Sequence, residues 1–299
     1  MATFARIEHG DSSKLTEILA EISGKVSLIV TSPPYFNAIS YAAHASHSSQ
    51  NYRDRYVENY DLEYLPFLDS VWEECLVMLK PGGYLCINVG SVLENGNHLP
   101  LPHDLASRLL SGLTDFSHFN TILWHKVTAG VKRAGGVISR PYPGYWYPNI
   151  MTEHILVFQK RGGQASSISQ RVPEDWFNPI WDIAPVPSRS ANHPAPFPEE
   201  IPHRLVSLFT EPGDIVLDPF NGSGTSTKAA FDLGRSAVGV ELQNSYVKLA
   251  KKRLEEESSL RSIQLQLGLT PREKFIPGAS QGQTRHGSGI AANRNSSNS

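Results

Sequence analysis

The segment 215–242 contains two acidic residues and two glycines whose types and spacing suit the binding of a nucleoside. Ile215–Leu217 is a short apolar run, typical of a parallel strand that is buried on both faces, and it ends at Asp218. Gly222 and Gly224 follow, and glycine permits both a tight turn and a close approach of the backbone to a ligand. We therefore expect a strand that ends in a ligand-binding loop.

A helix and a second strand complete this unit. The helix is predicted over about 225–233, and the apolar run 237–240 ends at Glu241. That carboxylate lies roughly 20 residues beyond the loop, the spacing at which an acidic side chain accepts hydrogen bonds from ribose hydroxyls. A dinucleotide fingerprint would need a third glycine where Thr227 stands, which favours an adenosyl group over a pyrophosphate. The alternative is that the glycines only terminate a strand.

Seven apolar runs with strand character alternate with helical segments. The predicted strands are Arg6–His9, Val26–Thr31, Tyr84–Val89, Phe119–His125, Glu153–Gln159, Ile215–Leu217 and Ala237–Val240. Helices are predicted over about 12–22, 62–79, 101–113, 198–210, 225–233 and 245–257. This alternation predicts an open, mostly parallel α/β sheet, whose ligands bind at the carboxyl ends of the strands. Asp11, Ser32, Asp218 and Glu241 all lie at such ends.

Length and composition are those of one large domain or of a domain with an insertion. The 299 residues are 40% hydrophobic, and no apolar run reaches the roughly 20 residues of a membrane helix, so we expect a cytoplasmic protein. Cys75 and Cys86 lack the spacing of a metal site and are expected in the core. His44 and His47 have no acidic or cysteine companions, so we expect no metal. A net charge of −2 means that any nucleic acid must be bound by a local basic face.

Two polar and aromatic insertions are candidates for that face. Residues 37–59 have no helical or strand period and are expected to form a long functional loop. The segment 126–152 mixes basic residues with aromatics, which suits phosphate contact and base stacking, although a solvated surface hairpin would share this composition. Its candidate nucleic-acid contacts are Lys126, Lys132, Arg133, Arg140 and Trp146. Residues 162–192 are interpreted as a connector whose aromatics pack on the core surface, and 270–299 as a disordered tail.

The strand Val26–Thr31 stops at Ser32-Pro33-Pro34-Tyr35, because prolines cannot donate hydrogen bonds to a sheet ladder. Together with the DPFNGSGT run 218–225, this motif resembles the two motifs of the DNA amino-methyltransferases that use S-adenosylmethionine. The motif order resembles the beta group, in which a catalytic half, here 1–161, precedes a cofactor-binding half, here 193–262. The resemblance extends to about Leu260 and implies a seven-stranded sheet in which Glu153–Gln159 is the reversed strand.

The resemblance also implies a set of cofactor-binding residues. They are Asp11, Asp218, Phe220, Asn221, Gly222, Ser223, Gly224, Thr225 and Glu241. Glu241 would hold the ribose hydroxyls, and Asp11 would lie near the adenine. His193–Phe197 resembles the segment that approaches the methionine end, although a plain proline-rich connector would have the same sequence character.

Catalysis is assigned by the same resemblance to Ser32, Pro33, Pro34 and Tyr35. An exocyclic amine on a base is a poor nucleophile, because its lone pair is delocalised into the ring. The Ser32 hydroxyl and the Pro33 carbonyl would draw the amine hydrogens out of the ring plane as the methyl group arrives. The prolines pre-organise the turn. Tyr35 would stack on a base flipped from the duplex, or would instead close the core after the strand.

Within the resembled family, serine at position 32 is more typical of N4-cytosine methylation than of N6-adenine methylation, which is the alternative. The expected partners are double-stranded DNA and, in a restriction-modification system, a cognate restriction endonuclease, with the chain a monomer or homodimer. An enzyme acting on RNA or a small molecule, and an inactive DNA-binding module, are further alternatives. The intact motif disfavours the inactive module, and the basic-aromatic insertion disfavours a small-molecule substrate. The sequence has no Pro-Cys dipeptide, which argues against a covalent cysteine mechanism.

Overall fold

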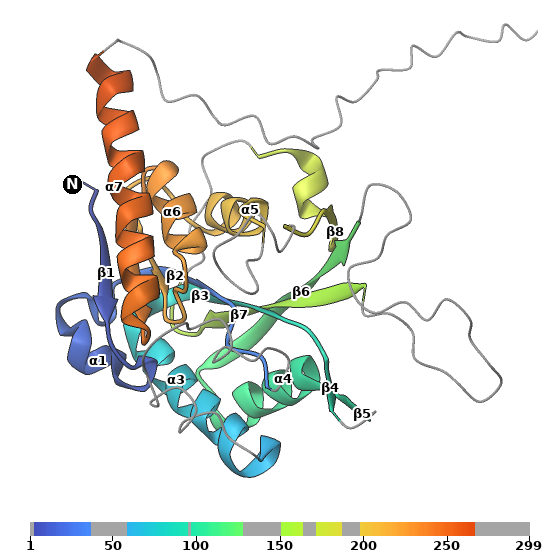
Figure 1. Ribbon diagram of the computed structural model, residues 1–299. Helices are drawn as coiled ribbons and strands as arrows, with labels where there is room; N and C mark the ends of the chain where they lie inside the picture. The colour runs from blue at the N-terminus through green and yellow to red at the C-terminus, as the bar shows by residue number, and fades with distance from the viewer. Residues whose placement is uncertain are drawn as a thin grey trace, which may run out of the picture.

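One mixed sheet organises the part of the chain that the structure describes (Figure 1). The computed structural model describes residues 3–36, 59–94, 97–127, 151–163, 172–186 and 198–266. In order across the sheet, its strands are β1 (Ala5–His9), β10 (Ser236–Glu241), β9 (Ile215–Asp218), β2 (Val26–Thr31), β3 (Leu79–Val89), β7 (Thr152–Lys160), β6 (Phe116–Lys126) and β8 (Ile180–Ile183). Strand β7 is antiparallel to both of its neighbours, which confirms the predicted reversed strand, and the other pairs are parallel.

Helices cover both faces of the sheet (Figure 1). On one face lie α1 (Leu15–Ile18), α3 (Leu65–Met78) and α4 (Leu101–Gly112), and on the other lie α5 (Glu200–Phe209), α6 (Thr225–Asp232) and α7 (Asn244–Gln266). The shorter elements are the 3-10 turns Ser12–Lys14, Ala20–Ile22 and Glu174–Phe177, the π-helical turn Tyr60–Tyr64, and the hairpin of β4 (Val92–Glu94) and β5 (Asn97–Leu99). The predicted α/β architecture is therefore confirmed.

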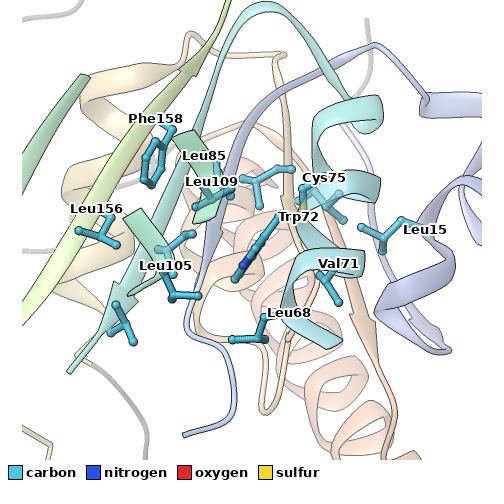
Figure 2. Close-up of a cluster of buried hydrophobic side chains, with 14 of the residues drawn as sticks. Leu15, Leu68, Val71, Trp72, Cys75, Leu85, Leu105, Leu109, Leu156 and Phe158 are labelled. Carbon is cyan, nitrogen blue, oxygen red and sulfur yellow. The ribbon is translucent and has the colours of Figure 1, made fainter. Parts of the chain in front are cut away.

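The central strands are buried on both sides, which explains their continuous apolar sequences. In β2, Ile29 packs in the cluster beneath α3, whereas Leu28 and Val30 pack in the cluster beneath α5. Figure 2 shows the first cluster. The Trp72 side chain extends from α3 toward the sheet and lies among side chains of α4 and of the strands. Both cysteines are fully buried core residues, as predicted: Cys75 lies in the first cluster and Cys86 in the second.

The chain changes direction in the sheet between β9 and β2. From β9 it passes through α6 to β10 on one side, whereas from β2 it passes through α3 to β3 on the other. The two strands pair in parallel through Leu28 with Val216 and Ile29 with Leu217. Open α/β sheets bind their ligands at such a switch point, where the carboxyl ends of adjacent strands diverge. The topology thus places the residues after Thr31 beside those after Leu217.

The prediction of one helix over 12–22 was wrong. The segment forms α1 between two 3-10 turns, because Lys14 (φ −138°, ψ 34°) and Leu19 (φ −126°, ψ 34°) leave the helical region. Leu15, Leu19 and Ile22 are nonetheless all buried. Their spacing matches a helical face, which accounts for the error.

The interpretation of 162–192 as a connector with surface aromatics was wrong in part. Residues 180–183 form β8, which extends the sheet beside β6, with Trp181 opposite Trp124, so the described sheet has eight strands rather than the seven predicted. Trp181 and Ile183 are buried while Ile180 is exposed, which is the alternation of a strand. Over four residues this alternation is too short to be recognised in a proline-rich sequence. The predictions for residues 37–58, 128–150, 193–197 and 270–299 lie outside the described residues.

Candidate active site

A buried hydrogen bond joins the two sequence motifs at the switch point. The Thr31 hydroxyl donates to Oδ1 of Asp218 over 2.7 Å, and the Phe220 amide donates to the same oxygen over 3.0 Å. Burial raises the pKa of Asp218 to about 6, against the opposing effect of these hydrogen bonds. Because Asp218 is only 2% exposed, its carboxylate stabilises the turn from the protein interior.

The glycine loop lies between Asp218 and α6. Gly222 has φ 50° and Gly224 has φ 85°, so both occupy the left-handed region that favours glycine, and Gly224 is the residue before the first turn of α6. A Cβ on Gly224 would lie 3.0 Å from the Cβ of Ala250 in α7. The loop therefore packs close to α7, which leaves no room for a side chain at Gly224.

The side chains of the loop stabilise it through contacts with the rest of the protein. Oδ1 of Asn221 accepts a 2.9 Å hydrogen bond from Thr227, and this side chain packs so closely on Gly239 that a Cβ there would lie 2.4 Å from Asn221. Arg253 of α7 donates to the carbonyl and hydroxyl of Ser223 over 2.8 and 3.1 Å. Sequence reasoning grouped Asn221 and Ser223 with the cofactor ligands; their side chains make protein contacts.

Glu241 ends β10 beside the loop, as predicted. Its Oε2 accepts from the Gly222 amide over 2.8 Å, and its Oε1 accepts from the Gln243 amide over 2.8 Å. Burial raises the pKa of this carboxyl group, while the amide hydrogen bonds oppose the shift. Each carboxylate oxygen retains further acceptor capacity, so the geometry suits a pair of ribose hydroxyls.

The end of β1 lies on the other side of Glu241. His9 pairs with Glu241 in the sheet register, so Asp11 follows at the same carboxyl edge, and it accepts a 3.2 Å hydrogen bond from the Ser13 amide. Ser12, which sequence reasoning missed, is buried and donates to the carbonyl of Pro219. Asp11, the loop and Glu241 therefore line one edge of the sheet, as predicted.

The remaining loop residues begin and support α6. Thr225 is its first residue and is buried. The Phe220 ring contacts the rings of Phe67 and Trp72 in α3, with centroids 6.3 and 6.2 Å apart. The loop is thereby anchored to helices on both faces of the sheet.

The Ser-Pro-Pro-Tyr motif lies directly after β2, next to the glycine loop. Pro33 and Pro34 are buried, whereas Ser32 and Tyr35 are partly exposed. The buried hydroxyl of Tyr64 donates a 2.7 Å hydrogen bond to the Pro34 carbonyl. A second support comes from the Phe36 ring, whose centroid lies 5.4 Å from the rings of both Tyr60 and Tyr64. The π-helical turn 60–64 thus fixes the motif from behind.

A buried carboxylate completes this side of the site. Oε2 of Glu153 in β7 accepts from the Tyr35 hydroxyl over 2.8 Å and from Nδ2 of Asn88 over 2.7 Å, and its Oε1 lies 2.5 Å from Nζ of Lys126. Sequence reasoning placed Glu153 in a strand without assigning it a role. Glu153 lies between Thr152 and His154 at the polar start of β7, so the local sequence carries no clear signal of its burial.

Of the predicted nucleic-acid contacts, only Lys126 lies within the described residues. Lys126 is bound to Glu153, and its Nζ lies 5.2 Å from the centroid of the Trp124 ring. Lys132, Arg133, Arg140 and Trp146 lie outside the described residues. Across the described ranges, no group of three or more His, Cys, Asp or Glu side chains could hold a metal ion, and no helix is long and apolar enough to cross a membrane.

Comparison with known proteins agrees with this geometry. The profile of a DNA methylase family that covers N6 and N4 enzymes matches residues 26–252. The Type II methyltransferase M.MjaI of Methanocaldococcus jannaschii is 30% identical over 92% of this chain and 97% of its own length. The DNA adenine methyltransferase YhdJ of Escherichia coli is 29% identical over 84% of this chain and 83% of its own length.

Solved structures show the same fold. TTHA0409 from Thermus thermophilus, solved in complex with S-adenosyl-L-methionine, is 34% identical, with a TM-score of 0.61 over 85% of this chain and 94% of its own. The cytosine-N4-specific PvuII DNA methyltransferase is 20% identical, with a TM-score of 0.65 over 90% of this chain and 94% of its own. The fold is thus that of an amino-methyltransferase. The chain belongs to the N4-cytosine and N6-adenine DNA methylase family, and S-adenosylmethionine as its cofactor is confirmed.

Proposed function

We propose that the chain methylates the exocyclic N4 amine of cytosine at specific sites in duplex DNA. The observation that carries this proposal is Ser32, a neutral, partly exposed hydroxyl that follows β2 directly beside the strand bearing the glycine loop. Serine at this position is more typical of the N4-cytosine enzymes in the family. A carboxylate there would be typical of the adenine enzymes.

The cofactor pocket that this function requires would be formed by the glycine loop and Glu241. The partly exposed backbone at Gly222 and the buried acceptors of Glu241 fit a nucleoside. Gly224 fixes the course of the loop, because its φ is left-handed and α7 packs where its side chain would lie. When bound, S-adenosylmethionine supplies an electrophilic methyl group. Asp218 and Thr31 keep the loop beside the Ser32 turn by their shared hydrogen bond.

The chain itself reshapes the amine. The Ser32 hydroxyl oxygen and the Pro33 carbonyl accept the amine hydrogens and draw them out of the ring plane, which returns the lone pair to the nitrogen. Once methylated, the nitrogen is cationic and releases one of these hydrogens as a proton, which passes by way of the Ser32 hydroxyl to solvent. The Pro34 carbonyl is already bound to Tyr64, so that bond orients the turn rather than the substrate. Because Pro34 has no N–H and its φ is locked, the turn needs little reorganisation when a base arrives.

Tyr35 supplies a face on which the flipped base stacks. Flipping costs a few kcal/mol, and stacking on an aromatic ring offsets part of that cost. We further propose that Lys132, Arg133, Arg140 and Trp146 contact the DNA. Lys126 remains a predicted contact as well, and its ammonium group is paired with Glu153 in the structure.

N6-adenine methylation is the second candidate, and one observation favours it. The relative YhdJ is named as a DNA adenine methyltransferase and aligns along most of both chains. The name of M.MjaI as a Type II methyltransferase supports a companion restriction endonuclease for this chain as well.

Mass spectrometry of nucleosides tests the base. Purified protein is incubated with plasmid DNA and S-adenosylmethionine that carries a deuterated methyl group, and the DNA is then digested to nucleosides. Labelled N4-methylcytidine in its deoxy form is the expected product. Labelled N6-methyldeoxyadenosine would overturn the cytosine assignment. Labelled 5-methyldeoxycytidine, or label in RNA supplied to a parallel reaction with none in DNA, would overturn the role of the Ser32 motif.

A further inference from the structure

Glu153 connects three separate parts of the active-site edge. It is the second residue of β7, the one strand of the described sheet that runs against its neighbours, so the start of this strand lies at the carboxyl ends of the parallel strands. Three donors meet on its carboxylate: Tyr35 from the catalytic turn, Asn88 from β3 and Lys126 from β6. The reversed direction of β7 is what brings this side chain to the substrate edge.

The carboxylate is nearly closed off from solvent. The side chain of Glu153 is 12% exposed and that of Lys126 is 17% exposed. A buried carboxylate is costly unless it is paired and hydrogen-bonded, and here both of its oxygens have partners. A carboxylate with both oxygens engaged has few alternative arrangements, so it holds the Tyr35 hydroxyl at a fixed point, although Oδ1 of Asn88 is buried without a hydrogen-bond partner.

The packing at Gly90 independently supports a fixed placement of the side chains of Tyr35 and Glu153. A Cβ at this position would lie 3.0 Å from Cγ of Glu153 and 3.7 Å from Cε1 of Tyr35. The end of β3 therefore packs against the two side chains at the point where they meet. Any residue larger than glycine would displace one of them.

We propose that Glu153 is a positioning residue that sets the plane of the Tyr35 ring for the target base, an inference that rests on the proposed base-flipping function. Asn88 and Lys126 hold the Glu153 carboxylate, and this carboxylate holds the hydroxyl end of Tyr35. The other end of the Tyr35 side chain is fixed by the Ser-Pro-Pro backbone, which Tyr64 supports. With both ends fixed, the long axis of the ring is held. Because a phenolic O–H lies in the plane of its ring, donation to Glu153 also favours one ring plane, so the ring presents one face to the base with little further loss of rotational freedom.

The test is a double-mutant cycle on single-turnover methylation. The substrates are duplex oligonucleotides that carry the site identified by sequencing methylated plasmid. Tyr35→Phe keeps the ring and removes the hydroxyl, and Glu153→Gln keeps the shape and removes the charge. Each single variant should methylate roughly tenfold more slowly, since each loses a hydrogen bond to a charged group. The double variant should be no slower than the slower single variant, because both changes break the same contact.

Two further measurements separate positioning from general damage. The affinity for S-adenosylmethionine should be unchanged in both variants, and their rate defects should shrink on a duplex whose target base is mismatched and easier to extrude. Asp69→Asn is a matched control, because Asp69 of α3 is also a carboxylate paired with a basic side chain, that of Arg108, and does not contact Tyr35 or Glu153 in the described residues. Gly90→Ala should reproduce the defect, whereas Gly112→Ala, where a Cβ would meet nothing within 4 Å, should not.

Several outcomes would overturn the inference. Wild-type rates in Tyr35→Phe would do so even if Glu153→Gln failed to fold, and so would independent losses that multiply in the double variant. A defect that is equal on matched and mismatched duplexes would indicate a structural role only. If the wild-type protein methylated no DNA base, the proposed function itself would fail; an active wild-type protein with an unaffected Tyr35→Phe variant would contradict only the role of Glu153.

Discussion

The hydroxyl of Thr31 donates a 2.7 Å hydrogen bond to Asp218, a residue 187 positions further along the chain. Thr31 is the last residue of β2, directly before the catalytic turn, and Asp218 is the last residue of β9, directly before the glycine loop. Both side chains are buried. The positions of the catalytic turn and of the cofactor loop are therefore coupled by one contact at the switch point of the sheet.

Replacing Thr31 by valine should loosen that coupling. The change keeps the side-chain shape and leaves Asp218 with one fewer donor, so the free energy of unfolding should fall by about 1–3 kcal/mol. Urea denaturation measures this, and calorimetry should show weaker S-adenosylmethionine binding. Thr121→Val on β6 is the control, because the hydroxyl of Thr121 contacts His118 at an exposed site. Equal stability of the two variants would contradict the importance of the contact.

The raised pKa of Asp218 predicts a pH dependence with a definite sign. A carboxyl group whose pKa rises from 3.8 when unfolded to about 6 when folded binds more protons in the folded state between these values. Its contribution to stability is therefore fully present below about pH 4 and is lost as the pH rises through about 6. The difference in unfolding free energy between wild type and Asp218→Asn should decrease by up to about 3 kcal/mol from pH 4 to pH 7. A constant or increasing difference would contradict this.

Crowding at the glycine loop gives a third prediction. Gly224→Ala would place a Cβ 3.0 Å from that of Ala250, on a residue with φ 85°, so the loop should shift and the affinity for S-adenosylmethionine should fall at least tenfold in calorimetry. Gly213→Ala shares the strain of a positive φ, 91°, but its Cβ would meet nothing within 4 Å. It should lose about 1 kcal/mol of stability and retain cofactor affinity. Retained affinity in Gly224→Ala would mean that the loop does not bind the cofactor.

DNA contact by the segment 126–152 remains a prediction. Replacing Lys132 and Arg133 by alanine should weaken DNA binding and reduce its dependence on salt concentration, by roughly one unit of slope for each phosphate that the variant no longer binds. Lys251 and Lys252 are exposed on α7 and serve as the matched pair of controls. A salt dependence that changes only in the control pair would place the DNA on another surface.

Much of the fold could be predicted because its signals are local. The strand, loop and helix from Ile215 to Asp232 lie within a short stretch, and the acidic ends of β9 and β10 follow from the apolar runs before them. The reversed β7 was predicted from resemblance alone, because periodicity gives a strand no direction. Its apolar sequence would suit either orientation.

The rest depends on contacts that are distant in sequence. Glu153 meets Tyr35 across 118 positions, and Tyr64 meets Pro34 across 30, so neither pattern shows in any local window. Strand β8 has only four residues, and Trp181 is buried because β6 supplies its partner, Trp124. Asn221 and Ser223 belong to the cofactor motif by position, but only the packing of Gly239 and Arg253 shows where their side chains lie.

Single-turnover methyl transfer by Ser32→Ala tests the central claim most directly, because it removes one acceptor from the catalytic turn and leaves the backbone in place. With radiolabelled S-adenosylmethionine and saturating duplex DNA, the variant should bind the cofactor with wild-type affinity and transfer the methyl group about 30- to 1,000-fold more slowly, a loss of roughly 2–4 kcal/mol of transition-state stabilisation. Ser111→Ala, at an exposed position in α4, should retain the wild-type rate. A wild-type rate in Ser32→Ala, with cofactor binding intact, would contradict the proposed chemistry.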